Sequence, residues 1–103
     1  MTAFIITRDH IEDDDPKDVE VFGPRGLTDK DKDRLRAGEG IEFQLLDDDR
    51  ELYYEGRRLE ESDCDHWYGG ETELAPLDCW GMPNAGCTQQ RERDAKGIFD
   101  NIN

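Results

Sequence analysis

The sequence predicts a single α+β domain over residues 1–103, built as a small antiparallel sheet of hairpins with one short helix. A length of 103 residues suits one domain and is too short for two. Strand-like alternation occurs on both sides of an acidic turn at Asp47–Asp49, whereas a capped helical pattern occurs at Thr28–Ala37. Because helix and strands are segregated along the chain, an α+β fold is favoured.

The composition lies near the boundary between folded and disordered proteins. Apolar residues make up 34% of the chain and charged residues 39%, a balance that is also typical of disorder. However, two Trp, three Tyr and four Phe residues lie in short patterned segments separated by glycine-containing turns. These aromatic residues favour a folded domain with a small core.

The N-terminal part is predicted to be extended. Thr2–Thr7 contains the longest apolar run and is predicted to form a first strand. The acidic stretch Glu12–Asp18 is predicted to be a solvated loop, and Val19–Val21 a short extended piece. This piece ends at Gly23-Pro24, a pair that is typical of turns.

A short helix is predicted at Thr28–Ala37. Thr28 is a favourable N-cap residue, and Gly38 is a favourable residue just beyond the helix. Acids precede bases at the three-residue spacing that supports a helix, in the pairs Asp29–Lys32, Asp31–Arg34 and Asp33–Arg36. Since Leu35 is its main apolar residue, the helix is expected at the edge of the sheet rather than inside a core.

Two hairpins are predicted in the second half of the chain. Ile41–Leu45 and Leu52–Glu55 alternate around the acidic turn, which is the strongest structural signal in the sequence. Thr88–Arg93 and Gly97–Ile102 are predicted to form a final hairpin. Between the two hairpins, residues 60–86 are rich in Gly, Pro and acids and are predicted to be a long irregular excursion. The predicted element order is therefore β-β-α-β-β-β-β.

Acidic residues provide the clearest functional signal. The chain has 27 Asp and Glu against 13 Lys and Arg, a formal net charge of −14. Self-repulsion at such a charge opposes folding, so we infer that a basic partner selects for it. Alternate carboxylates of an extended strand stand about 6.6–6.8 Å apart, and a row of them can imitate the dense charge of a nucleic-acid backbone.

The predicted partner-binding residues form three clusters. They are Glu12, Asp13, Asp14, Asp15 and Asp18, then Asp47, Asp48 and Asp49, and finally Glu60, Glu61, Asp63 and Asp65. The second cluster is extended by Glu51 and Glu55. The alternative explanation for these clusters is a solvated surface that only serves solubility.

Two patterns resemble the start of a calcium-binding EF-hand loop, Asp29-x-Asp31-x-Asp33 and Asp47-x-Asp49-x-Glu51. Both lack the required Gly at the sixth position and the Glu at the twelfth, so no specific calcium site is predicted.

A zinc site is the main alternative that uses the cysteines. Cys64, His66, Cys79 and Cys87 supply a Cys₃His set, but their spacing matches no standard zinc motif. The simpler interpretation is that Cys79 and Cys87 are small buried apolar residues near Trp80. We therefore predict no metal and no cofactor, and keep a small metal-binding or housekeeping domain as the alternative function.

Catalysis is not predicted. Cys64 with His10 or His66 would provide a nucleophile and a base, but no known catalytic signature surrounds them. An acidic field also raises the pKa of a thiol, which opposes its activation.

The segment Ala75–Thr88 is the least charged part of the chain. Its Pro and Gly residues predict a tightly turned loop. Trp80 and Met82 are predicted to fill the core, with an apolar anchor for a partner as the alternative.

The sequence predicts a cytoplasmic protein. It contains no apolar stretch long enough to span a membrane and no signal-peptide pattern, and three cysteines fit reduced thiols better than disulfides. The negative charge disfavours direct binding to nucleic acid or to anionic membranes.

Several segments together resemble a known group of proteins. These are Ile5–Ile11, Asp47–Gly56, Ala75–Asp78 and Gly81–Thr88. The chain resembles short acidic proteins of bacteria, phages and mobile elements, and in size and charge it is similar to DNA-mimicking anti-CRISPR and anti-restriction proteins. The resemblance implies a non-catalytic inhibitor that occupies a basic DNA- or RNA-binding surface of a host defence complex, such as a CRISPR surveillance complex.

Overall fold

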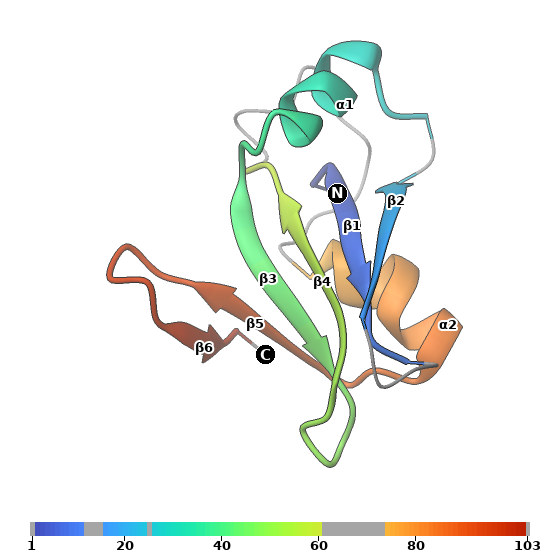
Figure 1. Cartoon of the computed structure of the whole chain (residues 1–103), viewed down its shortest axis with the longest axis vertical. Coiled ribbons are helices and arrows are strands. Elements are labelled where there is room, and N and C mark those ends of the chain that lie inside the picture. Colours follow the sequence, from blue (N-terminus) through green and yellow to red (C-terminus); the bar gives the residue numbers. More distant parts are fainter. Residues whose placement is uncertain (1, 12–15, 25, 61–73, 103) are drawn as a thin grey trace.

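Six antiparallel strands form one sheet in the computed structural model, which describes residues 2–11, 16–24, 26–60 and 74–102 (Figure 1). The order of the strands across the sheet is β2-β1-β4-β3-β5-β6. Their bounds are β1 Phe4–Asp9, β2 Lys17–Gly23, β3 Ile41–Leu46, β4 Leu52–Arg58, β5 Gln89–Arg93 and β6 Phe99–Asn101. The helical elements within these ranges are α1 Asp29–Arg36, the π-helical turn η2 Leu77–Gly81, and α2 Met82–Ala85. The predicted α+β fold is confirmed.

Both predicted hairpins are present. β3 pairs with β4 around the acidic turn, and β5 pairs with β6. The apolar side of the β3–β4 alternation places Phe43 and Leu45 on one face, where Tyr54 lies opposite Leu45. Alternation of side chains across a strand thus decides which face of the sheet is buried.

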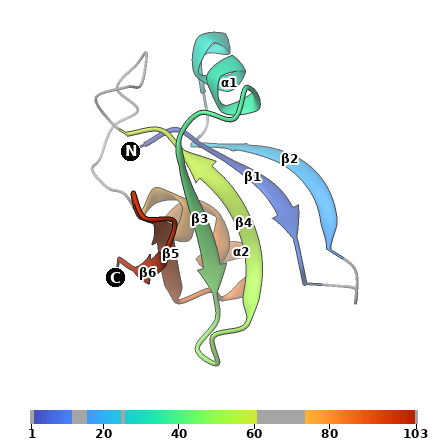
Figure 2. The ribbon, with the colours of Figure 1, turned by 60° about the vertical axis from the view of Figure 1, so that its left-hand side comes forward.

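The main core lies between this face and the η2–α2 segment (Figure 2). Phe4, Phe43 and Leu45 from the sheet are almost fully buried, together with Leu77 and Cys87 from the covering segment. The prediction that residues 60–86 form an irregular excursion is wrong for residues 75–85, which are helical; residues 61–73 lie outside the described part of the chain.

The residues that predict a loop here are those that allow two short helical elements to lie against the sheet. Pro83 is in the first turn of α2, where the fixed φ of proline fits the helical backbone. Gly86 has φ +69° and ends α2 in the left-handed conformation. A Cβ on Gly81 would lie 3.0 Å from both Leu45 and Cys87, so Gly81 permits a close approach to β3.

The second core lies on the opposite face, beneath α1 at one end of the sheet (Figures 1 and 2). Leu35 of α1 is fully buried and shares a cluster with Ala3, Ile5, Leu27 and Leu59. The helix begins as predicted, because the Thr28 side chain accepts a hydrogen bond from the N–H of Asp31 at 3.3 Å. Helix α1 therefore packs on the sheet through Leu35 and contributes to this second core but not to the main core.

Trp80 and Met82, both predicted to fill the core, differ in their burial. Trp80 is half-buried and packs edge-to-face on Tyr54, with ring centroids 5.6 Å apart. Met82 is 52% exposed, so the prediction that it fills the core is wrong. Met82 begins α2 one residue after Gly81 contacts the sheet, and the helical rotation directs its side chain outward.

Candidate acidic interface

Five of the twelve predicted partner-binding residues lie in the described part of the chain: Asp18, Asp47, Asp48, Asp49 and Glu60. The other seven, Glu12, Asp13, Asp14, Asp15, Glu61, Asp63 and Asp65, lie outside it. The five do not form one surface. Strand register places Asp18 toward the same end of the sheet as the acidic turn, whereas Glu60 follows the opposite end of β4.

Asp47 has a structural role in the turn between β3 and β4. Its Oδ1 accepts hydrogen bonds from the backbone N–H of Asp49 at 2.9 Å and of Glu51 at 2.8 Å. Arg50 adopts φ +65°, and its N–H donates to the carbonyl of Asp47 at 3.1 Å. A further hydrogen bond, from the Tyr53 hydroxyl to Asp47, together with the charge of that carboxylate, raises the pKa of Tyr53. Asp47 therefore fixes the loop rather than offering its carboxylate to a partner.

The exposed carboxylates of this turn are Asp48, Asp49 and Glu51, which we name the acidic tip. Asp48 accepts a hydrogen bond from the Thr88 hydroxyl at 2.7 Å, which ties the tip to the chain entering β5. Glu51 is not among the twelve predicted partner-binding residues, although the sequence shows it as an extension of this cluster directly after the turn. Glu51 is exposed and directly precedes β4, so it belongs to the same turn as the two predicted aspartates, at the end of the β3–β4 hairpin (Figure 1).

The acids of β2 lie beside bases from neighbouring elements. Arg8 Nε is 3.5 Å from Asp18, because Arg8 and Asp18 are opposite each other in the β1–β2 register. Arg36 of α1 is 2.9 Å from Glu20. Such exposed pairs contribute little to stability, on the order of 0–1 kcal/mol, but they reduce the local negative potential along β2.

Other arginines are likewise paired within the chain. Arg34 pairs with Glu39, Arg93 with Glu42, and Arg58 with Glu92. Within the described ranges, none of the observed ion pairs involves Asp48, Asp49 or Glu51. The acidic tip is therefore the described acidic cluster with the clearest access for an external cation.

The helical calcium-like pattern cannot form a loop site. Asp29, Asp31 and Asp33 lie in α1, where residues two apart point to different sides, and Asp31 is fully buried. Among the described residues, no group of three His, Cys, Asp or Glu side chains is arranged to hold a metal ion.

The cysteine environment opposes ionisation of the thiols. Cys87 is fully buried in the main core, and burial together with the Asp47 carboxylate raises its pKa to about 11. Burial and the neighbouring Asp78 also raise the pKa of Cys79, which is half-buried. Zinc binds the thiolate rather than the thiol, so these raised pKa values disfavour both residues as ligands. Cys64 and His66 lie outside the described residues, and the predicted absence of a metal stays a prediction.

We expect Cys87 to be nearly inert toward thiol reagents in the native protein. At pH 8, a pKa of about 11 leaves roughly one thiolate in a thousand, and the reagent must also reach a buried sulfur. In a Cys64→Ser background, iodoacetamide followed by peptide mass spectrometry should label Cys79 first and Cys87 only after unfolding. Equal labelling rates in the native protein would contradict the buried position of Cys87.

His10 is engaged at the end of β1. Its Nε2 lies 3.0 Å from Oε2 of Glu55, and its backbone N–H donates to Tyr53 at 2.9 Å. Cys64, the nucleophile considered beside His10 in the sequence, lies outside the described part of the chain.

Comparison of the chain with protein-family models, with curated proteins and with solved structures finds no match. The resemblance to short acidic phage proteins thus stays a prediction. None of the helices in the described ranges has the length and apolar character needed to cross a bilayer.

Proposed function

We propose that this protein is a non-catalytic inhibitor whose carboxylates occupy a basic nucleic-acid-binding surface of a host defence complex, such as a CRISPR surveillance complex in the cytoplasm. The observation that carries the proposal is the position of exposed charge. The chain has a net charge of −14, and Asp48, Asp49 and Glu51 are exposed in the turn that joins β3 to β4, at the end of this hairpin (Figure 1).

The turn supports this function because hydrogen bonds within the chain itself hold its backbone. Two backbone N–H groups bond to Asp47, and Thr88 holds Asp48. A partner therefore meets carboxylates whose backbone is already fixed, which lowers the entropic cost of binding. Arg and Lys residues that normally hold phosphate would form charge-assisted hydrogen bonds with these carboxylates.

The same charge distribution supports a protein partner rather than nucleic acid or membrane. Phosphate backbones and anionic lipids would be repelled by a net charge of −14. Attraction to a basic groove, in contrast, speeds encounter and makes binding sensitive to salt.

Reversing the charge of the acidic tip should weaken binding to the partner by about tenfold or more, equivalent to ~1.4 kcal/mol. The test variant is Asp48→Lys/Asp49→Lys. Its matched control, Asp33→Lys/Asp100→Lys, changes the net charge equally at exposed positions of α1 and β6. The partner is first captured from a bacterial lysate at about 50 mM salt and released at about 500 mM. Binding of each variant to it is then measured by interferometry.

Competition with nucleic acid completes the test. The proposal requires that duplex DNA or RNA displaces the wild-type protein from the captured partner. It would be wrong if nucleic acid and this protein bound the partner together, or if the tip variant bound as well as wild type. Equal weakening by the tip and control variants would show that total charge, not the acidic tip, determines binding.

A further inference from the structure

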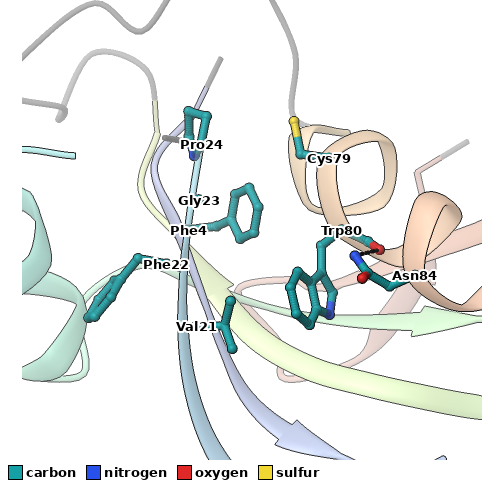
Figure 3. Close-up of a pocket in the computed structure, with 8 residues that line it drawn as sticks. All are labelled: Phe4, Val21, Phe22, Gly23, Pro24, Cys79, Trp80 and Asn84. Carbon is teal, nitrogen blue, oxygen red and sulfur yellow. Dashed lines mark hydrogen bonds between the residues drawn. The ribbon is translucent and has the colours of Figure 1, made fainter. Parts of the chain in front are cut away.

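An apolar pocket of about 430 Å³ opens between β2 and the η2–α2 segment (Figure 3). None of its lining residues in the described part of the chain is charged. The lining residues that matter here are Phe4, Val21, Gly23, Cys79, Trp80 and Asn84.

The shape of the pocket follows from small and aromatic residues. A Cβ at Gly23 would lie 2.3 Å from Cζ of Phe4, so the phenyl ring occupies the space above the strand end that a side chain would fill. Trp80 extends from η2 on the other side and is supported by its edge-to-face contact with Tyr54. The Asn84 side chain donates a hydrogen bond to the carbonyl of Trp80 at 2.8 Å. This bond joins α2 to η2 on the helical side of the pocket.

The pocket lies beside an edge of the sheet. Within the described residues, β2 pairs with β1 alone, so its outer side presents backbone N–H and C=O groups that another strand can use. Gly23 pairs with Phe4 and Val21 with Ile6, so both face the same side as the pocket. A strand added to the outer edge of β2 would direct alternate side chains to that side.

Charge decides which strand fits this edge. A second copy of the chain would bring another charge of −14, which disfavours pairing of β2 with itself. In β2 itself, Asp18 and Glu20 are exposed and Lys17 is the single base, and the Asp18 side chain remains 91% exposed although Arg8 lies 3.5 Å from it. Asp78 is exposed on the helical wall beside Cys79. These acids favour a cationic segment.

We propose that β2 and the adjacent pocket bind an extended segment of a basic protein, which adds a strand to the sheet and inserts one large apolar side chain beside Trp80. Lysine or arginine residues of that segment lie toward the acidic start of β2. This inference rests on the proposed function for its basic partner, but it assigns a second contact, distinct from the acidic tip and dependent on shape as well as charge.

A synthetic peptide can test the pocket without knowledge of the partner. The probe is a nonapeptide of alternating lysine and valine with a central leucine, and its control has glycine at the centre. We expect the leucine peptide to bind at least about tenfold more tightly, because burying its side chain removes apolar surface from water. We also expect slower amide hydrogen exchange over residues 17–23 when it binds. A version with alternate N-methylated amides has the same charge and should bind weakly, since it cannot pair as a strand.

Two variants fill the pocket from opposite walls, Val21→Trp on β2 and Cys79→Phe on η2. In each variant that keeps the wild-type circular dichroism spectrum, the leucine and glycine peptides should bind equally. Three results would overturn the inference. The leucine and glycine peptides could bind the wild-type protein equally well, or the ratio of their affinities could be unchanged in a folded pocket variant. The leucine peptide could also fail to slow amide hydrogen exchange over residues 17–23. Dimerisation of the free protein through β2 would also overturn it in favour of a second copy.

The variant Asp48→Lys/Asp49→Lys separates this inference from the proposed function. It should retain the preference for leucine over glycine, because the acidic tip lies at the β3–β4 turn and not in the pocket. If the wild-type protein does not prefer the leucine peptide but nucleic acid still displaces it from the captured partner, the pocket assignment alone is wrong. If it prefers the leucine peptide but nucleic acid does not displace it, the inhibitor function alone is wrong.

Discussion

Replacement of Glu92 with alanine is expected to lower the free energy of unfolding by about 3–5 kcal/mol, because it leaves the buried guanidinium of Arg58 without its counter-charge. Arg58 is 8% exposed and donates two hydrogen bonds to Glu92. Its Nε donates to Oε2, and its Nη2 donates to Oε1 at 2.7 Å. Charge-assisted bidentate pairs of this kind have strict geometry.

The pair belongs to a longer polar chain inside the molecule. Gln90 is fully buried, and its Nε2 donates to Glu92 Oε2 at 3.1 Å. Its Oε1 accepts from the backbone N–H of Leu77 at 3.2 Å, a donor at the start of η2. Glu92 therefore orients the glutamine that joins β5 to the helical segment over the main core.

A double variant provides the control for this prediction. Arg58→Met with Glu92→Leu removes both charges and should be much less destabilising than Glu92→Ala alone, since no ion is left buried. Urea unfolding followed by circular dichroism measures all the variants. A loss below about 1 kcal/mol for Glu92→Ala, or a double variant less stable than the single one, would contradict a buried ion pair.

The hairpins could be predicted from the sequence, whereas the sheet order could not. Apolar and polar residues alternate on both sides of Asp47–Asp49, which is a local signal. The short turn between these two segments fixes the pairing of β3 with β4. The pairing of β1 with β4 and of β3 with β5 joins segments far apart along the chain. No local pattern encodes these contacts, because they depend on which buried faces can be covered together.

The sequence does not predict the helical segment at 75–85, because Pro83, Gly81 and Gly86 are compatible with a loop as well as with short helices. In isolation these residues predict a loop. In the fold, Pro83 lies in a first turn, Gly81 lies against β3, and Gly86 caps the end. Only the tertiary contact with Leu45 distinguishes the two situations.

The acidic site was predicted in outline but not in its division of roles. Asp48 and Asp49 are exposed at the turn as charge and turn propensity indicate. Asp47 differs because its carboxylate bonds to two N–H groups of its own loop, and Asp18 differs because strand pairing places Arg8 beside it. Composition counts carboxylates, but only the backbone geometry shows which of them are already engaged.

Replacement of Gly56 with alanine is expected to lower the free energy of unfolding by about 3 kcal/mol or more. Gly56 lies in β4, between β1 and β3, and is buried. A Cβ there would lie 2.0 Å from the carbonyl oxygen of Ile5 and 2.7 Å from Cζ of Phe43. The first of these is a backbone atom of the neighbouring strand, so β1 and β4 must separate before the methyl group fits.

Gly38→Ala is the matched control, because it adds the same methyl group where nothing lies within 4 Å. Gly38 has φ +93°, so alanine there costs only backbone strain, about 1–2 kcal/mol. Thermal and urea unfolding compare the two variants. A Gly56→Ala protein as stable as Gly38→Ala would contradict the close approach of β1 and β4. Separation of β1 and β4 would also disturb both proposed contacts, since β1 supplies Phe4 to the pocket and β4 begins directly after the acidic tip.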